Sequence, residues 1–216
     1  MPADANLLIE KETPRVPGWA LLLFVVAFLA IGFVALGALP DAGMLAVLGV
    51  FFAVGLLAVA VAVAPLGRTA PAALGLRPAG WKYFVFGPLA TVALSIIASQ
   101  FGIEPEGMKQ VTEIVRSPGQ LALSLLLLAG LAPLVEELIF RGLVYGWLAG
   151  RWGSTVAWIV SSLAFAGAHW EPAHIVLVLP LGLMFGWLRR RSDSLLPSLA
   201  AHVVNNALAL VGAAYI

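Results

Sequence analysis

Apolar residues run along this chain in long stretches, separated by short segments that hold most of its Pro, Gly and charged residues. A helix needs roughly 20 apolar residues, at about 1.5 Å each, to cross the hydrocarbon core of a bilayer. Breakers fall between the stretches, so the pattern predicts seven membrane helices. Their expected ranges are Trp19–Leu39, Met44–Leu66, Trp81–Phe101, Leu121–Leu148, Thr155–His169, Ala173–Leu188 and Leu195–Tyr215. We expect an all-α, polytopic membrane helical bundle that forms a single membrane domain over residues 1–216.

Composition supports this class. Of the 216 residues, 62% are hydrophobic and 11% are charged, whereas soluble domains have about 45–50% apolar and about 25% charged residues. The net charge of +1 lies in short loops and gives no indication of nucleic-acid binding. The absence of cysteine excludes disulfides, a thiol nucleophile and thiolate metal ligands. The first residues lack the pattern of a cleaved signal, so we expect the first helix to be retained.

The distribution of Lys and Arg predicts the orientation. Nine of these residues lie in the N-terminal tail and the even-numbered loops, two lie in the odd-numbered loops, and Arg141 lies within a span. The nine are Lys11, Arg15, Arg68, Arg77, Lys82, Arg151, Arg189, Arg190 and Arg191. The positive-inside rule then predicts a cytoplasmic N-terminus and an external C-terminus. Residues 102–120 are expected to form a long external loop or a short helix on the surface.

Polar side chains within the spans concentrate in the second half of the chain. A charge at the centre of a bilayer costs at least about 2.5–3.5 kcal/mol, so such residues indicate a site. They are Glu136, Glu137, Arg141, His169, His202, Asn205 and Asn206. We therefore expect residues 1–117 to form scaffold helices and the last four helices to form a site.

Helical spacing sorts these residues by face. Glu137 and Arg141 are four apart and can form an ion pair, whereas Glu136 is turned by about 100° from Glu137. His202 and Asn206 share a face, and Asn205 is turned away from it. Phe165 and His169 also share a face. Three helices can therefore direct a carboxylate, two imidazoles and an amide into one interior space.

These groups suit hydrolysis. A carboxylate in an apolar site can take a proton from water, and imidazole and amide donors can stabilise the oxyanion of an attacked amide. The same groups are also candidates to hold a metal that activates the water. The H-E-x-x-H pattern of soluble zinc proteases is absent.

Three short sequences carry a resemblance to a known family. EELIFR at 136–141, FAGAH at 165–169 and HVVNN at 202–206 resemble the E-E-x-x-x-R, F-x-x-x-H and H-x-x-x-N motifs of the CAAX protease and bacteriocin-processing (CPBP, or Abi) family of intramembrane proteases. This family includes the type II CAAX prenyl endopeptidases, and the resemblance covers roughly residues 118–211. It implies an endopeptidase whose active site lies within the membrane.

The resemblance also implies roles for the motif residues. Glu136 would activate water with the help of His169, and His202 and Asn206 would form the oxyanion site. Glu137 and Arg141 would form a supporting ion pair, with Phe165 packed beside the site. In the metal-dependent alternative, Glu136, His169 and His202 would be the ligands of a Zn²⁺ ion.

Other interpretations stay open at this stage. The chain could be a non-enzymatic immunity factor for a bacteriocin or a membrane assembly factor, or a proton-coupled transporter. The expected partners are the lipid bilayer and a membrane-associated peptide or protein, prenylated or not, with no nucleic acid. The composition favours a prokaryotic plasma membrane. We expect the site nearer the cytoplasmic side, His174 to be interfacial without a catalytic role, and Arg189–Arg191 to be a topology signal.

Overall fold

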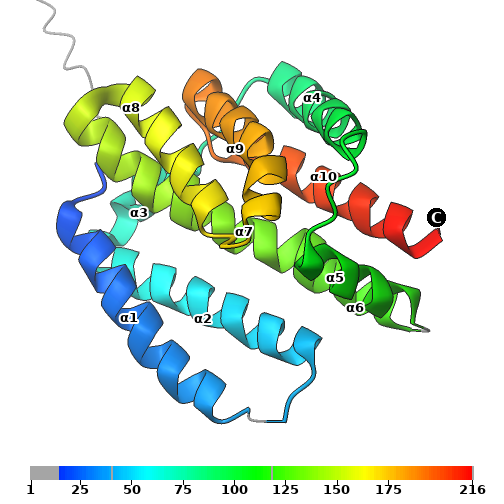
Figure 1. Ribbon diagram of the computed structural model, residues 1–216. Coiled ribbons are helices and arrows are strands. Elements are labelled where there is room, and N and C mark those ends of the chain that lie inside the picture. Colours follow the sequence, from blue (N-terminus) through cyan, green and yellow to red (C-terminus); the bar gives the residue numbers. More distant parts are fainter. Residues whose placement is uncertain (1–14, 40, 118, 216) are drawn as a thin grey trace, which may run out of the picture.

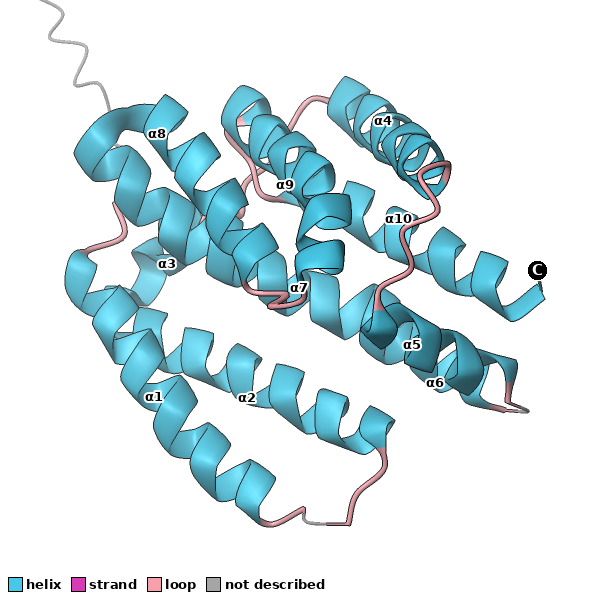
Figure 2. Cartoon of the chain, in the orientation of Figure 1, coloured by secondary structure: helices cyan, strands magenta, loops and turns pink. Residues whose placement is uncertain are grey.

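The computed structural model describes residues 15–39, 41–117 and 119–215 (Figure 1). Lys11, which contributes to the predicted charge bias, lies outside these residues. The described residues form helices and connecting loops, without strands (Figure 2). The elements are α1 (Gly18–Gly37), α2 (Met44–Val63), η1 (Ala64–Thr69), α3 (Ala70–Ala73), α4 (Trp81–Ser99), α5 (Glu106–Arg116), α6 (Gln120–Ser124), η2 (Leu125–Leu131), α7 (Ala132–Glu137), η3 (Leu138–Val144), α8 (Tyr145–Gly167), α9 (Pro172–Ser192) and α10 (Leu196–Tyr215).

Six helices of the described residues are long and apolar enough to cross a membrane, against the seven that the sequence predicts. The difference arises in one continuous helical stretch of 48 residues, Gln120–Gly167. Gly153 within it has φ 84° and ψ 165°, which is not helical, and the chain reverses there (Figure 1). The stretch therefore contains the predicted fourth and fifth helices. The second of them, at about 22 Å for its 15 residues, is short for a bilayer.

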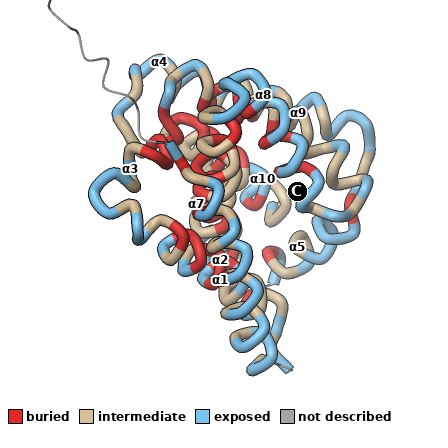
Figure 3. Tube along the Cα trace, turned by 90° about the vertical axis from the view of Figure 1, so that its left-hand side faces the viewer, coloured by how far each residue is buried: buried red, intermediate tan, exposed pale blue. Residues whose placement is uncertain are grey.

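Many large apolar side chains point outward, as a surface that faces lipid requires. In α1, Phe33 is 85% exposed, and Leu89 of α4 is 67% exposed. Buried residues gather around α7 and its neighbours, whereas the outer parts of α1 and α2 are exposed (Figure 3). Helix α1 packs on α2, α8 packs on α9, and α10 packs on α4 and η2. The central helix is therefore enclosed, and its polar residues are removed from lipid.

Two π-helical turns, η2 and η3, flank α7. In a π-helix each carbonyl accepts from the N–H five residues later, and such turns occur frequently at functional sites. Pro133, near the start of α7, has no N–H to donate. The polar residues Glu136 and Glu137 thus lie in a short α-helical segment between two irregular turns.

The two faces of the bundle differ in charge. The Arg-rich face carries Arg15, the η1–α3 segment, the start of α4, the Gly153 turn and the end of α9. The opposite face carries the α1–α2 connection, α5 and the end of α10 (Figure 1). Helix α5 confirms the prediction of a short helix within residues 102–120. Its only cations are Lys109 and Arg116, which are also the only ones on this face among the described residues.

Candidate active site

Glu136 and Glu137 are neighbours in the sequence but occupy different environments. The side chain of Glu136 is 21% exposed, whereas that of Glu137 is fully buried. Glu136 lines a cavity and Glu137 does not. The helical rotation of about 100° between successive residues accounts for this difference. Glu136 is therefore the carboxylate that a substrate or a water molecule can reach.

His202 joins the two carboxylates. Its Nδ1 lies 3.1 Å from Oε1 of Glu137, and its Nε2 lies 3.5 Å from Oε2 of Glu136. The sequence analysis placed Glu136 and Glu137 on different faces but did not anticipate that one imidazole contacts both. Because a buried carboxylate accepts hydrogen bonds, Nδ1 carries a proton that it donates to Glu137. This fixes Nε2 as the nitrogen that faces Glu136.

Arg141 supplies the positive charge of the cluster. It is fully buried, and its Nη1 lies 3.3 Å from Oε1 of Glu137, which confirms the predicted ion pair. This distance is short enough for an ion pair, but the contact does not have the geometry of a hydrogen bond. Nε and Nη1 of Arg141 have no hydrogen-bond partner within the described residues. Nη2 donates to the carbonyl oxygen of Gly182 at 2.8 Å. The guanidinium also lies over the ring of Phe165, 4.4 Å from its centroid.

The charges of this cluster balance only with one shared proton. Ionised Glu137 and Arg141 neutralise each other, which leaves Glu136 and His202. A net charge is costly in a low-dielectric interior. The pair is neutral when one proton resides on Glu136, with His202 uncharged, or when that proton resides on His202 and Glu136 is ionised. A neutral site would therefore carry one proton, either on the carboxylate of Glu136 or on the imidazole of His202.

A backbone irregularity positions Asn206. The Nδ2 of Asn206 donates to the carbonyl oxygen of Leu128 at 3.1 Å. In the π-helical turn η2 the expected donor to Leu128 is residue 133, which is proline. The N–H of Ala132 is already bonded to Leu127. The carbonyl of Leu128 is thus free to hold the Asn206 amide, and the second hydrogen of that amide remains available.

Replacing Pro133 tests this arrangement. The Pro133→Ala variant supplies an N–H that competes with Asn206 for the carbonyl of Leu128. If Asn206 donates to the substrate, we expect kcat for peptide cleavage to fall by about 2- to 10-fold, the worth of one hydrogen bond, with KM unchanged. Pro180→Ala in α9, away from the cavity, is the matched control. Equal kcat for both variants would show that Pro133 does not position Asn206.

His169 lies beside a second histidine. Its Nδ1 is 3.0 Å from the carbonyl oxygen of Phe165. Because a carbonyl only accepts, Nδ1 is the donor and Nε2 keeps a free lone pair. The ring of Phe165 makes edge-on contacts with both His169 and His202, at centroid distances of 5.1 and 5.7 Å. The ring centroid of His174 lies 4.5 Å from that of His169, and His174 also lines the cavity. The prediction placed His174 at the membrane interface and did not include these contacts.

One cavity of about 450 Å³ brings the predicted catalytic residues together. Glu136, His169, His202 and Asn206 all line it, with Phe165. Residues of α2 and α5, in the predicted scaffold, complete its wall. From Glu136 and His202 the cavity extends to the start of α2, to α5 and to the end of α10. It therefore extends from the polar residues toward α5 and the end of α10, and the expected depth of the site in the membrane stays a prediction.

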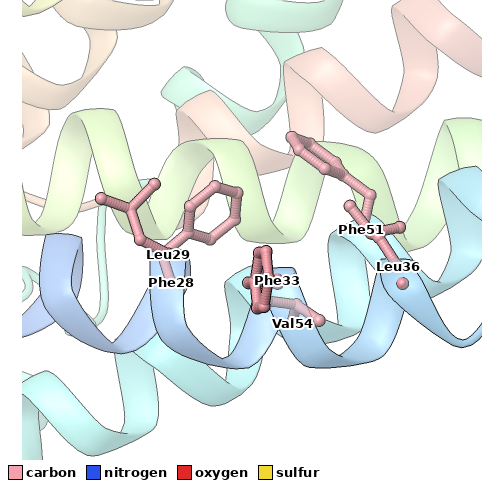
Figure 4. A pocket seen from close by; sticks show the side chains of 8 residues that line it. Phe28, Leu29, Phe33, Leu36, Phe51 and Val54 are labelled. Atoms are coloured by element: carbon pink, nitrogen blue, oxygen red, sulfur yellow. The ribbon is translucent and has the colours of Figure 1, made fainter.

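A second hollow, between α1 and α2, has a volume of about 570 Å³ (Figure 4). Side chains of Phe28, Leu29, Phe33, Phe51 and Val54 line it, together with Leu36 and two glycines. None of these side chains can donate or accept a hydrogen bond or exchange a proton. The cavity at Glu136, which is lined by acidic, imidazole and amide side chains, is therefore the better candidate for a catalytic site.

The predicted metal ligands do not form a metal site in this arrangement. Across residues 15–39, 41–117 and 119–215, no three side chains of His, Cys, Asp or Glu are grouped closely enough to hold a metal ion. His202 directs its Nδ1 to Glu137, and His169 does not join Glu136 and His202 in a ligand set. The donors therefore do not fit a Zn²⁺ ion held by Glu136, His169 and His202.

Three supporting residues escaped the sequence analysis. The hydroxyl of Ser198 donates to Oε2 of Glu137 at 2.8 Å, and its position four residues before His202 is a signal that could have found it. Phe185 stacks on His202 at 4.5 Å between centroids, without a comparable signal. Arg189 is buried, and its Nε donates to the carbonyl oxygen of Arg141 at 3.1 Å. Arg189 therefore has a structural role in addition to its contribution to the predicted positive-inside bias.

Comparison with known proteins agrees with the motifs that line this cavity. Residues 118–208 match the family model of the type II CAAX prenyl endopeptidases, Rce1-like. The resemblance inferred from the three motifs is thereby confirmed. All the motif residues, Glu136 to Asn206, lie inside the matched range.

A curated relative supports the same assignment. The Bacillus subtilis (strain 168) protein named "Putative membrane peptidase YdiL" is 23% identical over 130 residues, which are 60% of this chain and 47% of that protein. The chain thus spans about half the length of the relative it matches. No solved structure matches. Together with the six apolar helices, these relationships identify a multi-pass membrane protein.

Proposed function

We propose that this protein is an intramembrane endopeptidase that hydrolyses a peptide bond of a membrane-associated protein or peptide. The observation that supports this most is that Glu136, His169, His202 and Asn206 meet in one cavity inside a membrane bundle. The match to the type II CAAX prenyl endopeptidases gives independent support. A binding protein would gain nothing from burying so many polar groups at such a cost.

The reaction begins with a water molecule between Glu136 and the scissile carbonyl group. Ionised Glu136 takes a proton from this water as the oxygen attacks the carbonyl carbon. The neutral Nε2 of His169 orients the water and shares the proton. A tetrahedral intermediate forms, and its oxyanion needs hydrogen-bond donors in a site with little water.

His202 and Asn206 supply those donors. While Glu136 is ionised, the shared proton resides on His202, so Nε2 donates to the oxyanion. Glu137 stabilises this imidazolium through Nδ1. Asn206 contributes its second amide hydrogen. When the C–N bond breaks, the proton held by Glu136 passes to the leaving amine, and the carboxylate is regenerated.

The two neighbouring histidines provide a matched test of this proposal. We expect His169→Ala to lower the cleavage of a membrane-associated peptide by about 100-fold or more, because it removes a base. We expect His174→Ala, in the same cavity, to retain most of the activity, because that ring packs on His169 but takes no part in the proposed proton transfers. Purified variants in detergent are compared for cleavage rate and thermal unfolding. Equal losses in both, or none in either, would contradict the role of His169.

A further inference from the structure

A hollow of about 370 Å³ lies between the start of α4 and the end of α9, which pack against each other. Its walls consist of two basic and three aromatic side chains, namely Lys82, Tyr83, Phe86, Trp187 and Arg191. The hydroxyl of Tyr83 donates to the carbonyl oxygen of Arg191 at 3.0 Å, which ties the two helix ends together. The rings of Phe86 and Trp187 are in contact, with 5.7 Å between their centroids. The hollow therefore combines positive charge with apolar surface.

The two cations of this hollow are not neutralised by the protein. Neither Lys82 nor Arg191 forms a salt bridge in the described part of the chain. Asp193, two residues after Arg191, pairs instead with Arg77 and Arg189, at 2.6 and 3.2 Å. Lys82 and Arg191 are exposed at the ends of two apolar helices that are long enough to cross the membrane. Basic side chains at the ends of such helices lie at the level of the lipid headgroups.

A second hollow, of about 270 Å³, adjoins the first on its apolar side. It shares Phe86 and Trp187 with the first hollow, and its other walls are Leu94, Trp158, Pro180, Leu183 and Met184. From Pro180 to Arg191, α9 rises by about 17 Å at about 1.5 Å per residue. This is about half of the roughly 30 Å thickness of the hydrocarbon core. The two hollows together, here called the α4–α9 groove, therefore have about the length of one leaflet and carry their charges at one end.

We infer that the α4–α9 groove binds one anionic phospholipid, with the headgroup phosphate at Lys82 and Arg191 and an acyl chain along the apolar hollow. Lipid binding of this kind combines burial of apolar surface with electrostatic attraction. A free phosphate would use the two charges but would gain nothing from the apolar hollow. No residue of the groove lines the cavity at Glu136. The inference is therefore independent of the proposed peptidase activity.

Native mass spectrometry of the full chain in neutral detergent measures its affinity for phosphatidylglycerol, which is anionic, and for phosphatidylcholine, which has no net charge. We expect one phosphatidylglycerol to bind the wild type about 10-fold or more tightly than phosphatidylcholine does. Each cation next to an anionic lipid contributes about fivefold to the affinity. Lys82→Gln combined with Arg191→Gln should therefore lower the affinity for phosphatidylglycerol by about 25-fold, and Arg191→Gln alone by about fivefold. Binding of phosphatidylcholine should change little in either variant.

The matched control is Arg68→Gln combined with Arg151→Gln, which removes two charges from exposed residues outside the groove. We expect its affinity for phosphatidylglycerol to stay close to that of the wild type, because screening limits the reach of exposed charges. Lys82→Arg combined with Arg191→Lys keeps both charges and should also bind like the wild type. Thermal unfolding without added lipid shows that each variant is folded.

Three results would overturn the inference. The first is a wild type that does not prefer phosphatidylglycerol to phosphatidylcholine. The second is an equal loss of affinity in the two double Gln variants, which would show that only the overall charge matters. The third is displacement of the bound lipid by glycerol 3-phosphate, which has the charged group but no acyl chain and should not compete at equal concentration.

Discussion

We expect the Glu136→Gln variant to fold normally and to lose peptide cleavage by a factor on the order of 10²–10⁴, the range for general acid–base catalysis. Glutamine has the same shape as glutamate but cannot take a proton from water. Its amide also cannot be protonated in place of His202, whose Nε2 lies 3.5 Å from the carboxylate of Glu136 in the wild type. The cleavage rate of purified protein, with thermal unfolding measured in parallel, gives the result.

The matched control is Glu113→Gln. Glu113 is an exposed glutamate on α5 that does not line the cavity. This variant loses one negative charge, as Glu136→Gln does, and we expect it to cleave at the rate of the wild type. Substantial cleavage by Glu136→Gln would show that Glu136 takes no part in the chemistry and that the buried charged residues have a structural role.

The second large effect concerns stability. We expect Glu137→Gln to lower the free energy of unfolding by about 3–5 kcal/mol, the cost of leaving a buried charge without its partner. Arg141 is fully buried, and Glu137 is its only ion-pair partner among the residues that the structure describes. Activity falls as well, since Glu137 no longer stabilises a protonated His202. Thermal or denaturant-induced unfolding in detergent, together with cleavage, measures both effects.

Two controls separate charge from hydrogen bonding. Ser198→Ala removes one hydrogen bond to Glu137 but leaves the ion pair, so we expect a loss of only about 1 kcal/mol. Glu137→Gln combined with Arg141→Met removes both charges and should recover much of the stability without recovering activity. Equal stability of Glu137→Gln and the wild type would show that the ion pair between Glu137 and Arg141 does not stabilise the fold.

Local spacing predicted the parts of the site that lie within one helix. Glu137 and Arg141, four residues apart, form the expected ion pair. Asn205, which was assigned away from the site, accepts a hydrogen bond from Ser95 of α4. The breakers between the apolar stretches also located the helix ends closely, although Pro88 and Pro180 lie inside helices.

Contacts between helices could not be predicted in the same way. Nothing in the sequence shows that the ring of His202 lies between two carboxylates, because its position depends on how α10 packs against α7. The π-helical turn that frees the Leu128 carbonyl depends on the backbone around Pro133.

The most direct test of the proposed peptidase compares the membrane proteomes of cells that express the wild-type protein and the Glu136→Gln variant. New peptide termini are identified by mass spectrometry. We predict a set of cleavage sites, in or next to membrane segments, that appear with the wild type and not with Glu136→Gln. Purified wild-type protein should reproduce these cuts on the isolated substrates. Identical peptide termini in both samples, at equal protein levels, would contradict the account.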